Sequence, residues 1–116
     1  MQWRRIRQFK TLLEARQHEL HLSIEDQKQY TRRAEPEPDA VDQAATVFDK
    51  ESFLHQNTQE RELLRMIDSA LGRIRDGNFG KCLSCGKEVD RRRLQAVPWT
   101  RYCIHCQERF ERRAYN

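Results

Sequence analysis

The chain has 116 residues, of which 37% are hydrophobic and 34% are charged, and its formal net charge is +4. Its mean hydropathy of -1.01 excludes a thick β-sandwich or a doubly wound sheet, because these folds bury more apolar surface than helices with a narrow seam. No apolar run approaches the roughly 18 residues that cross a bilayer, and no apolar signal segment follows the first arginines. We therefore expect a mainly helical, cytoplasmic protein.

A long first helix is predicted from Trp3 to about Arg33, a stretch without proline or glycine. Apolar residues recur in it at steps of three, four and seven, which is the spacing of a helical stripe. They are Ile6, Phe9, Leu13, Leu20 and, slightly off register, Ile24. Pro36 and Pro38 follow and must end this helix, because each removes a backbone donor and disfavours a helical conformation before it.

A second helix is predicted after Pro38, with a weak breaker at Gly72 and a stronger one at Gly77. Its apolar stripe comprises Val41, Ala45 and Phe48 near the start and Leu64, Ile67, Leu71 and Ile74 near the end. Two amphipathic helices joined by a short turn must lie antiparallel, because neither buries its stripe alone. The sequence therefore predicts a helical hairpin, an antiparallel coiled coil, over residues 1–76 with its tip at about residues 35–44.

Negative charge is concentrated at this tip. Between residues 35 and 51, six acidic residues stand against the single cation Lys50. Asp39 is placed to cap the second helix, and Asp42 lies near the positive end of its dipole, which would contribute about 1 kcal/mol or less each. Capping does not require the two acids that come before them, so we expect a functional role as well. A helix of roughly 30 residues is about 45 Å long and would hold this charge far from the rest of the protein.

A second module is predicted over residues 77–116, where the composition changes to cysteines, turns and arginines. Its two CxxC pairs, Cys82 with Cys85 and Cys103 with Cys106, have the spacing of a four-cysteine zinc site. Two intervening residues let both sulfurs face one ion at about 2.3 Å, and Gly86 can adopt the positive φ that closes such a knuckle. Four protein ligands leave no open position, so we expect one structural Zn²⁺. A short helix over about residues 107–115 is expected, the second cysteine pair is expected to open it, and its positive end would stabilise the thiolates.

Other metal and redox interpretations are weaker. A pair of redox dithiols lacks the βαβ context of thioredoxin-like motifs, and disulfides are disfavoured in a reducing compartment. His105 is expected to be an exposed bystander, since four sulfurs complete the shell. Glu14, His18 and His21 share a helical face, but exposed groupings of this kind are usually incidental.

With these motifs, the chain resembles the DksA/TraR family of transcription regulators, and it is most similar to the long-hairpin, DksA-like members. The tip sequence Asp39-Ala-Val-Asp42-Gln-Ala44 matches the family's DxxDxA motif. In the second module, Val89 stands where Ile is usual and Leu83 where a polar residue is usual. The residues at the intervals of the family's C4 signature are Cys82, Cys85, Val89, Arg93, Pro98, Cys103 and Cys106.

The resemblance implies a monomeric, zinc-containing regulator of bacterial RNA polymerase that is not an enzyme. Its hairpin would enter the secondary channel and bring Asp39, Asp42 and Ala44 close to the active centre, where such proteins alter promoter complexes. No membrane association and no direct sequence-specific DNA binding are expected. A role in the stringent response would follow from the family.

Two departures from the family pattern are visible. The sequence starts near the beginning of the first hairpin helix, so we expect it to lack the family's longer N-terminal segment. At the places where members that respond to guanosine tetraphosphate carry basic residues, this chain has Met66, Val97 and Gln107, although Arg65 or Arg101 could substitute. Phosphate recognition needs charge-assisted donors, so we expect reduced dependence, or none, on that nucleotide.

The arginine run Arg91, Arg92 and Arg93 either docks the module on the polymerase or solvates its surface, and Arg93 also fits the family signature as an internal contact. A rival interpretation is a zinc-ribbon nucleic-acid binder that uses these arginines and Trp99; it predicts steeply salt-dependent binding to free DNA. Trp99 and Tyr102 are more often core than a stacking surface. An enzyme is disfavoured, because the sequence has no catalytic triad, phosphate loop or open metal site.

Overall fold

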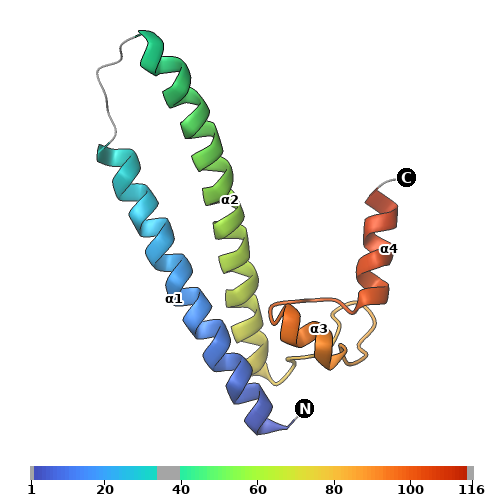
Figure 1. Ribbon diagram of the computed structural model, residues 1–116. Coiled ribbons are helices and arrows are strands. Elements are labelled where there is room, and N and C mark those ends of the chain that lie inside the picture. Colours follow the sequence, from blue (N-terminus) through green and yellow to red (C-terminus); the bar gives the residue numbers. More distant parts are fainter. Residues whose placement is uncertain (1, 34–39, 115–116) are drawn as a thin grey trace. The chain divides into compact units, whose positions relative to one another are not determined.

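The computed structural model describes the backbone of residues 2–33 and 40–114, and the side chains of residues 2–29 and 54–114. The described part is mainly helical (Figure 1). Its helices are α1 (Trp3–Arg33), α2 (Ala40–Asp76), α3 (Arg91–Ala96) and α4 (Ile104–Ala114). Within these residues, β structure is limited to one antiparallel bridge between Lys81 and Glu88. No helix in this part of the chain is both long and apolar enough to cross a membrane.

The two long helices are confirmed with the predicted bounds at Arg33 and before Gly77. Helix α2 passes through Gly72 and ends at Asp76, where Gly77 adopts a φ of 78°. The Gly77 amide donates to Ile74 O at 3.3 Å and the Asn78 amide donates to Arg73 O at 2.9 Å. These are the two bonds of a Schellman cap, which satisfies carbonyls at the end of a helix and favours glycine at the left-handed position.

The predicted tip lies largely outside the described residues. Asp42 and Ala44 fall within the backbone of α2, but their side chains are not described, and the predicted cap Asp39 precedes the helix in the undescribed segment. The stripe residues near the start of α2, Val41, Ala45 and Phe48, are likewise outside the described side chains. The tip residues therefore remain predictions.

The chain forms two compact units. The first contains Met1–Arg16 and Met66–Asn116, and the second contains Gln17–Arg65. Each unit takes a segment from α1 and a segment from α2, so the hairpin helices contribute to both. The predicted domain boundary at residues 76 and 77 coincides with the end of α2 and remains a prediction.

In the second unit, a polar contact joins the two helices beside the buried Leu20 and Ile24. Ser23 Oγ donates to Glu60 Oε2 at 2.8 Å, and Gln27 Nε2 donates to the same oxygen at 3.0 Å. Gln27 is only 8% exposed. A polar contact of this kind within an apolar seam fixes the register of two helices, because sliding either helix would separate its members.

In the first unit, the N-terminal part of α1 and the C-terminal part of α2 share a core with the cysteine-containing module. Leu13 and Ile67 are fully buried, and Phe79, which follows α2, packs on Phe9 with 5.4 Å between ring centroids. Leu94 of α3 belongs to the same set of buried residues. The predicted stripe is thus confirmed at Leu13 and Ile67, and Phe9 packs against the module.

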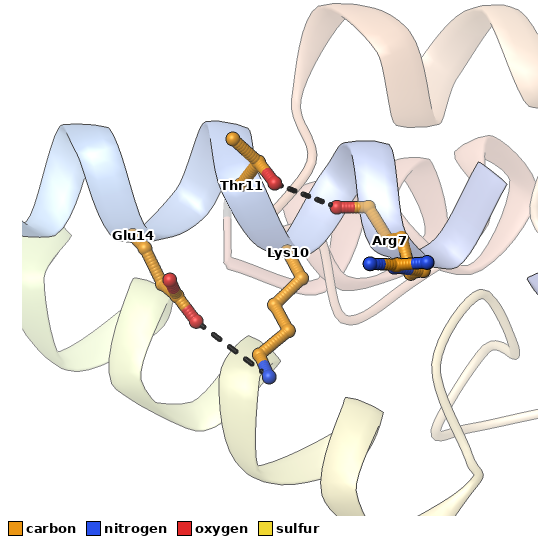
Figure 2. Close-up of polar contacts among 4 residues, drawn as sticks. All are labelled: Arg7, Lys10, Thr11 and Glu14. Atoms are coloured by element: carbon orange, nitrogen blue, oxygen red, sulfur yellow. Dashed lines mark hydrogen bonds and ion pairs between the residues drawn. The ribbon is translucent and has the colours of Figure 1, made fainter. Parts of the chain in front are cut away.

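The exposed side of α1 carries contacts within the helix (Figure 2). Thr11 Oγ1 donates to Arg7 O at 3.0 Å, and Lys10 Nζ lies 3.8 Å from Glu14 Oε1. An exposed ion pair at i,i+4 contributes about 0.3–0.5 kcal/mol, and a threonine hydroxyl that bonds the carbonyl four residues earlier does not stabilise the helix. The stability of these helices therefore comes mainly from the buried stripe.

Replacing Leu13 with alanine is expected to lower the free energy of unfolding by about 2–5 kcal/mol, because it leaves a cavity in a fully buried site. Denaturant unfolding followed by circular dichroism measures this loss. Leu12→Ala is the matched control, since Leu12 is 53% exposed and its truncation removes little packing. Equal losses for the two variants would contradict the assignment of the core.

Candidate metal centre

The first cysteine pair lies in a tight turn that follows the bridge residue Lys81. Gly86 has a φ of 74°, and its amide donates to Cys82 O at 2.9 Å. The Cys82 amide in turn donates to Lys87 O at 2.8 Å. The predicted left-handed glycine is confirmed, and these two bonds close the turn so that Cys82 and Cys85 lie near each other.

The second cysteine pair opens the last helix. Cys103 stands directly before α4, Cys106 lies in its first turn, and the Gln107 amide donates to Cys103 O at 2.9 Å. The helix starts at Ile104 and includes Cys106, which confirms that the second pair opens it, although its helical stretch was expected only from about Gln107. An edge contact between the Tyr102 and Phe110 rings, with centroids 4.8 Å apart, packs the helix on the segment before Cys103.

The four sulfur atoms converge. All lie within 4.8 Å of one another, and the Cys85 and Cys103 sulfurs are 3.8 Å apart. Tetrahedral Zn²⁺ with bonds of about 2.3 Å places its sulfurs about 3.8 Å from each other, so the cluster fits the ion. Cys82 and Cys106 are buried, whereas Cys85 is exposed. Among the described residues, this is the one group of His, Cys, Asp or Glu side chains close enough to share a metal.

The surroundings of the thiols shift their pKa values in different directions. Burial raises the pKa of Cys82, but the backbone amides of Cys103, Cys85 and Ser84 hydrogen-bond to its sulfur and bring the pKa down to about 6. The Cys106 amide lowers the pKa of Cys103 in the same way. A hydrogen bond with the Cys103 sulfur, and then burial, raise the pKa of Cys106 to about 11. A cation that binds all four sulfurs must displace the proton that Cys106 retains at neutral pH.

Comparison with known proteins identifies the family. Residues 77–112 match the family described as "Prokaryotic dksA/traR C4-type zinc finger". The structure of transcription factor DksA2 from Pseudomonas aeruginosa superposes with a TM-score of 0.88 at 31% identity, over 100% of this chain and 90% of that one. The chain belongs to the DksA/TraR family.

Two curated relatives are similar to most of the chain. RNA polymerase-binding transcription factor DksA from Salmonella typhimurium is 35% identical over 99 residues, which make up 84% of this chain and 66% of that protein. An uncharacterized protein of Aquifex aeolicus is 38% identical over 95 residues, 81% of this chain and 66% of its own length. The chain thus spans a little less than two thirds of the length of these relatives.

In this DksA/TraR family member, a short helix that sequence reasoning missed stands between the cysteine pairs. Asp90 caps α3, since its Oδ1 accepts the Arg92 amide at 2.9 Å. Leu94 anchors the helix in the core with 1% exposure. The signals that could have revealed α3 are an aspartate directly before the arginine run and Pro98 shortly after it.

The three predicted docking arginines differ in their exposure and contacts. Arg91 and Arg92 are exposed, whereas Arg93 is half-buried and its Nε donates to Tyr102 O at 3.0 Å. Arg93 therefore makes an internal contact. Docking of any of the three on a partner remains a prediction.

The remaining candidates occupy different places. His105 is exposed, as expected of a bystander, and the Trp99 and Tyr102 side chains are half-buried. Glu14, His18 and His21 are all exposed and form no metal cluster within the described residues. Sequence reasoning also missed Arg73, which is buried although charged. Arg73 lies off the predicted stripe of Ile67, Leu71 and Ile74, so helical periodicity gave no signal for its burial.

Substituting Cys106 with serine is expected to abolish zinc retention, because it removes one of four converging ligands. Purified protein is dialysed, and its metal content is measured by plasma mass spectrometry. His105→Ala is the matched control and should retain zinc, since the His105 side chain, next to Cys106 in the sequence, is exposed and lies outside the cluster. Zinc retained by Cys106→Ser, or lost only from His105→Ala, would contradict the ligand set.

Zinc affinity is also expected to fall as pH is lowered from 8 to 6, because protons then compete for the thiols. The Cys106 thiol, with a pKa of about 11, is protonated throughout this range without metal, so zinc uptake should release protons into a weakly buffered solution. Uptake without proton release would show that the sulfurs are not the ligands.

Proposed function

We propose that this chain is a non-enzymatic regulator of transcription that binds bacterial RNA polymerase and acts in the cytoplasm. The observation that carries the proposal is the 35% identity, over 84% of the chain, to a protein named for binding RNA polymerase. Likeness to the transcription factor DksA2 structure over the whole chain supports it further. The four-sulfur centre supports a structural role, because a complete protein shell has no position for a substrate.

The proposed mechanism places the α1–α2 hairpin in the secondary channel of the polymerase. Asp39, Asp42 and Ala44 then lie near the active centre, where two carboxylates interact with basic groups and with the catalytic metal. The acidic run between residues 35 and 51 supports this, because concentrated negative charge is attracted to a positively charged channel. The interhelical contact of Ser23 and Gln27 with Glu60 supports it too, because a fixed register keeps the two sides of the tip aligned.

The metal proposed for the cysteine cluster is a single structural Zn²⁺. Cys82, Cys85, Cys103 and Cys106 would hold it, and when bound it would cross-link the two knuckles. The ion is not expected to take part in a reaction. One zinc per chain is the expected stoichiometry.

The base of the protein is proposed to dock through α3. Arg91 and Arg92 are exposed on a helix that is rigidly capped by Asp90, so they present a fixed pair of cations to an acidic surface. Exposed arginines that only solvate the module would make no difference to polymerase affinity. The protein is proposed to act as a monomer.

Reduced dependence on guanosine tetraphosphate, or independence from it, is part of the proposal. Met66, Val97 and Gln107 are half-buried and carry no charge, and the Gln107 amide side chain donates to Glu111 at 3.1 Å. Arg65, a possible substitute, lies 3.5 Å from Glu62 in an exposed pair. Multiply charged phosphates require several charge-assisted donors, which these positions do not supply.

The alternative of a zinc-ribbon nucleic-acid binder receives less support. Stacking on bases requires accessible aromatic faces, but Trp99 is half-buried and Tyr102 packs against Phe110. Weak binding to free DNA, together with competition against other secondary-channel factors, distinguishes the polymerase regulator from this alternative.

Asp42→Asn is expected to abolish promoter regulation in an in vitro transcription assay while polymerase binding and zinc content are retained. The substitution keeps the size of the side chain and removes its charge. Asp76→Asn, at the opposite end of α2, is the control and should regulate as the wild type does. Full regulation by Asp42→Asn would contradict the proposed role of the tip.

Transcription from a ribosomal promoter is expected to respond equally to the protein with and without guanosine tetraphosphate, because its three aligned positions lack cations. The measurement is the yield of transcript across a titration of the protein. Activity that disappears when the nucleotide is omitted would contradict independence and direct attention to Arg65 and Arg101.

A further inference from the structure

In the four residues before Cys103, Trp99–Tyr102, every carbonyl group accepts a hydrogen bond from another part of the first unit. Arg73 Nη2 donates to Trp99 O and Thr100 O at 3.4 and 3.3 Å. The Leu83 amide donates to Arg101 O at 2.9 Å, and Arg93 Nε donates to Tyr102 O at 3.0 Å. These donors come from α2, the first knuckle and α3, so three elements fix a segment that has no regular structure of its own.

Arg73 is itself held in place. Its Nη1 donates to Ser69 Oγ, one turn earlier on α2, at 2.8 Å, and its side chain is 8% exposed. Burial, and then the neighbouring cation Arg101, lower the pKa of Arg73, but a guanidinium keeps its charge at neutral pH. The hydrogen-bond acceptors of this buried cation are neutral oxygens, which compensate its charge only in part. A centre of one Zn²⁺ and four thiolates carries a net charge of about -2, and its ligand Cys103 directly follows the segment.

We propose that Arg73 and Arg93 are positioning residues of the metal centre. Their hydrogen bonds hold the 99–102 segment so that Cys103 faces the other three sulfurs, and their positive charges offset the negative charge of the loaded centre. Both act through the segment that leads to a ligand. The inference rests on the zinc centre proposed above and is independent of the polymerase partner.

The two contributions of Arg73 can be separated. Its fork donates from two nitrogens, one to Ser69 and one to the pair of carbonyls, which a lysine ammonium on a flexible stem cannot reproduce. Arg73→Lys therefore keeps the charge and loses the fork, whereas Arg73→Met loses both and keeps an apolar stem.

The test is a titration of the full-length, metal-depleted protein with Co²⁺, whose thiolate and ligand-field absorption reports both affinity and tetrahedral geometry. Arg73→Met and Arg93→Met are each expected to raise the dissociation constant about 10–100-fold, as loss of outer-shell contacts does elsewhere. Arg73→Lys should fall between Arg73→Met and the wild type. Arg75→Met is the control on the exposed side of α2 and should bind Co²⁺ as the wild type does.

Wild-type Co²⁺ affinity in both methionine variants would overturn the inference, and so would a loss of thermal stability with no change in Co²⁺ affinity. If Arg73→Met loses the helical circular dichroism signal, the decision passes to Arg93→Met, which leaves α2 unaltered. A wild-type protein that binds neither Co²⁺ nor Zn²⁺ would overturn the metal centre and this inference together. Failure of the variants alone leaves the centre standing, so the two failures are distinguishable.

Discussion

Four thiols from two cysteine pairs must meet at one point, although 18 positions in the sequence separate Cys85 from Cys103. Most of the first unit is arranged around that requirement. The module after α2 has few large buried side chains of its own, chiefly Phe79, Val89 and Leu94. A core of that size does not hold a chain of turns together without an additional cross-link. Metal ligation by the four sulfurs would supply one, because binding to converging ligands adds directly to the free energy of folding.

The metal centre is connected to the hairpin within the first unit by two kinds of contact. Phe9 packs on Phe79, which joins α1 to the start of the module, and Arg73 reaches from α2 to the segment before Cys103. The sulfurs and the lower ends of both helices therefore belong to one packed body. A change at the cysteines should therefore alter that body first. The Ser23–Glu60 contact lies in the second unit and involves only the two long helices.

Much of this fold follows from the sequence, and the exceptions have physical reasons. The long helices could be predicted because their apolar residues recur over many turns and prolines and Gly77 delimit them. The cysteine spacing predicted the cluster, and Gly86 its turn. Helix α3 was missed because six residues show no periodicity, and its formation depends on the Asp90 cap and the burial of Leu94.

Arg73 could not be assigned from pattern alone. Periodicity places charged residues in solvent, and the burial of this one depends on carbonyls that are 26 and 27 positions away. The exact start of α4 could not be predicted for a similar reason, since its first turn is fixed by the Cys103 carbonyl and by the Tyr102–Phe110 contact. Local sequence predicts elements with a long repeat, whereas contacts between distant segments decide the short ones.

The most direct measurement is amide hydrogen exchange of the full chain with and without zinc, read by mass spectrometry. If the metal organises the first unit, its removal will deprotect the 97–106 region and the adjoining ends of α1 and α2, while residues 17–29 and 54–65 keep their protection. Unchanged exchange around the cysteines after zinc removal would contradict the account, because the turns would then be held by their own packing.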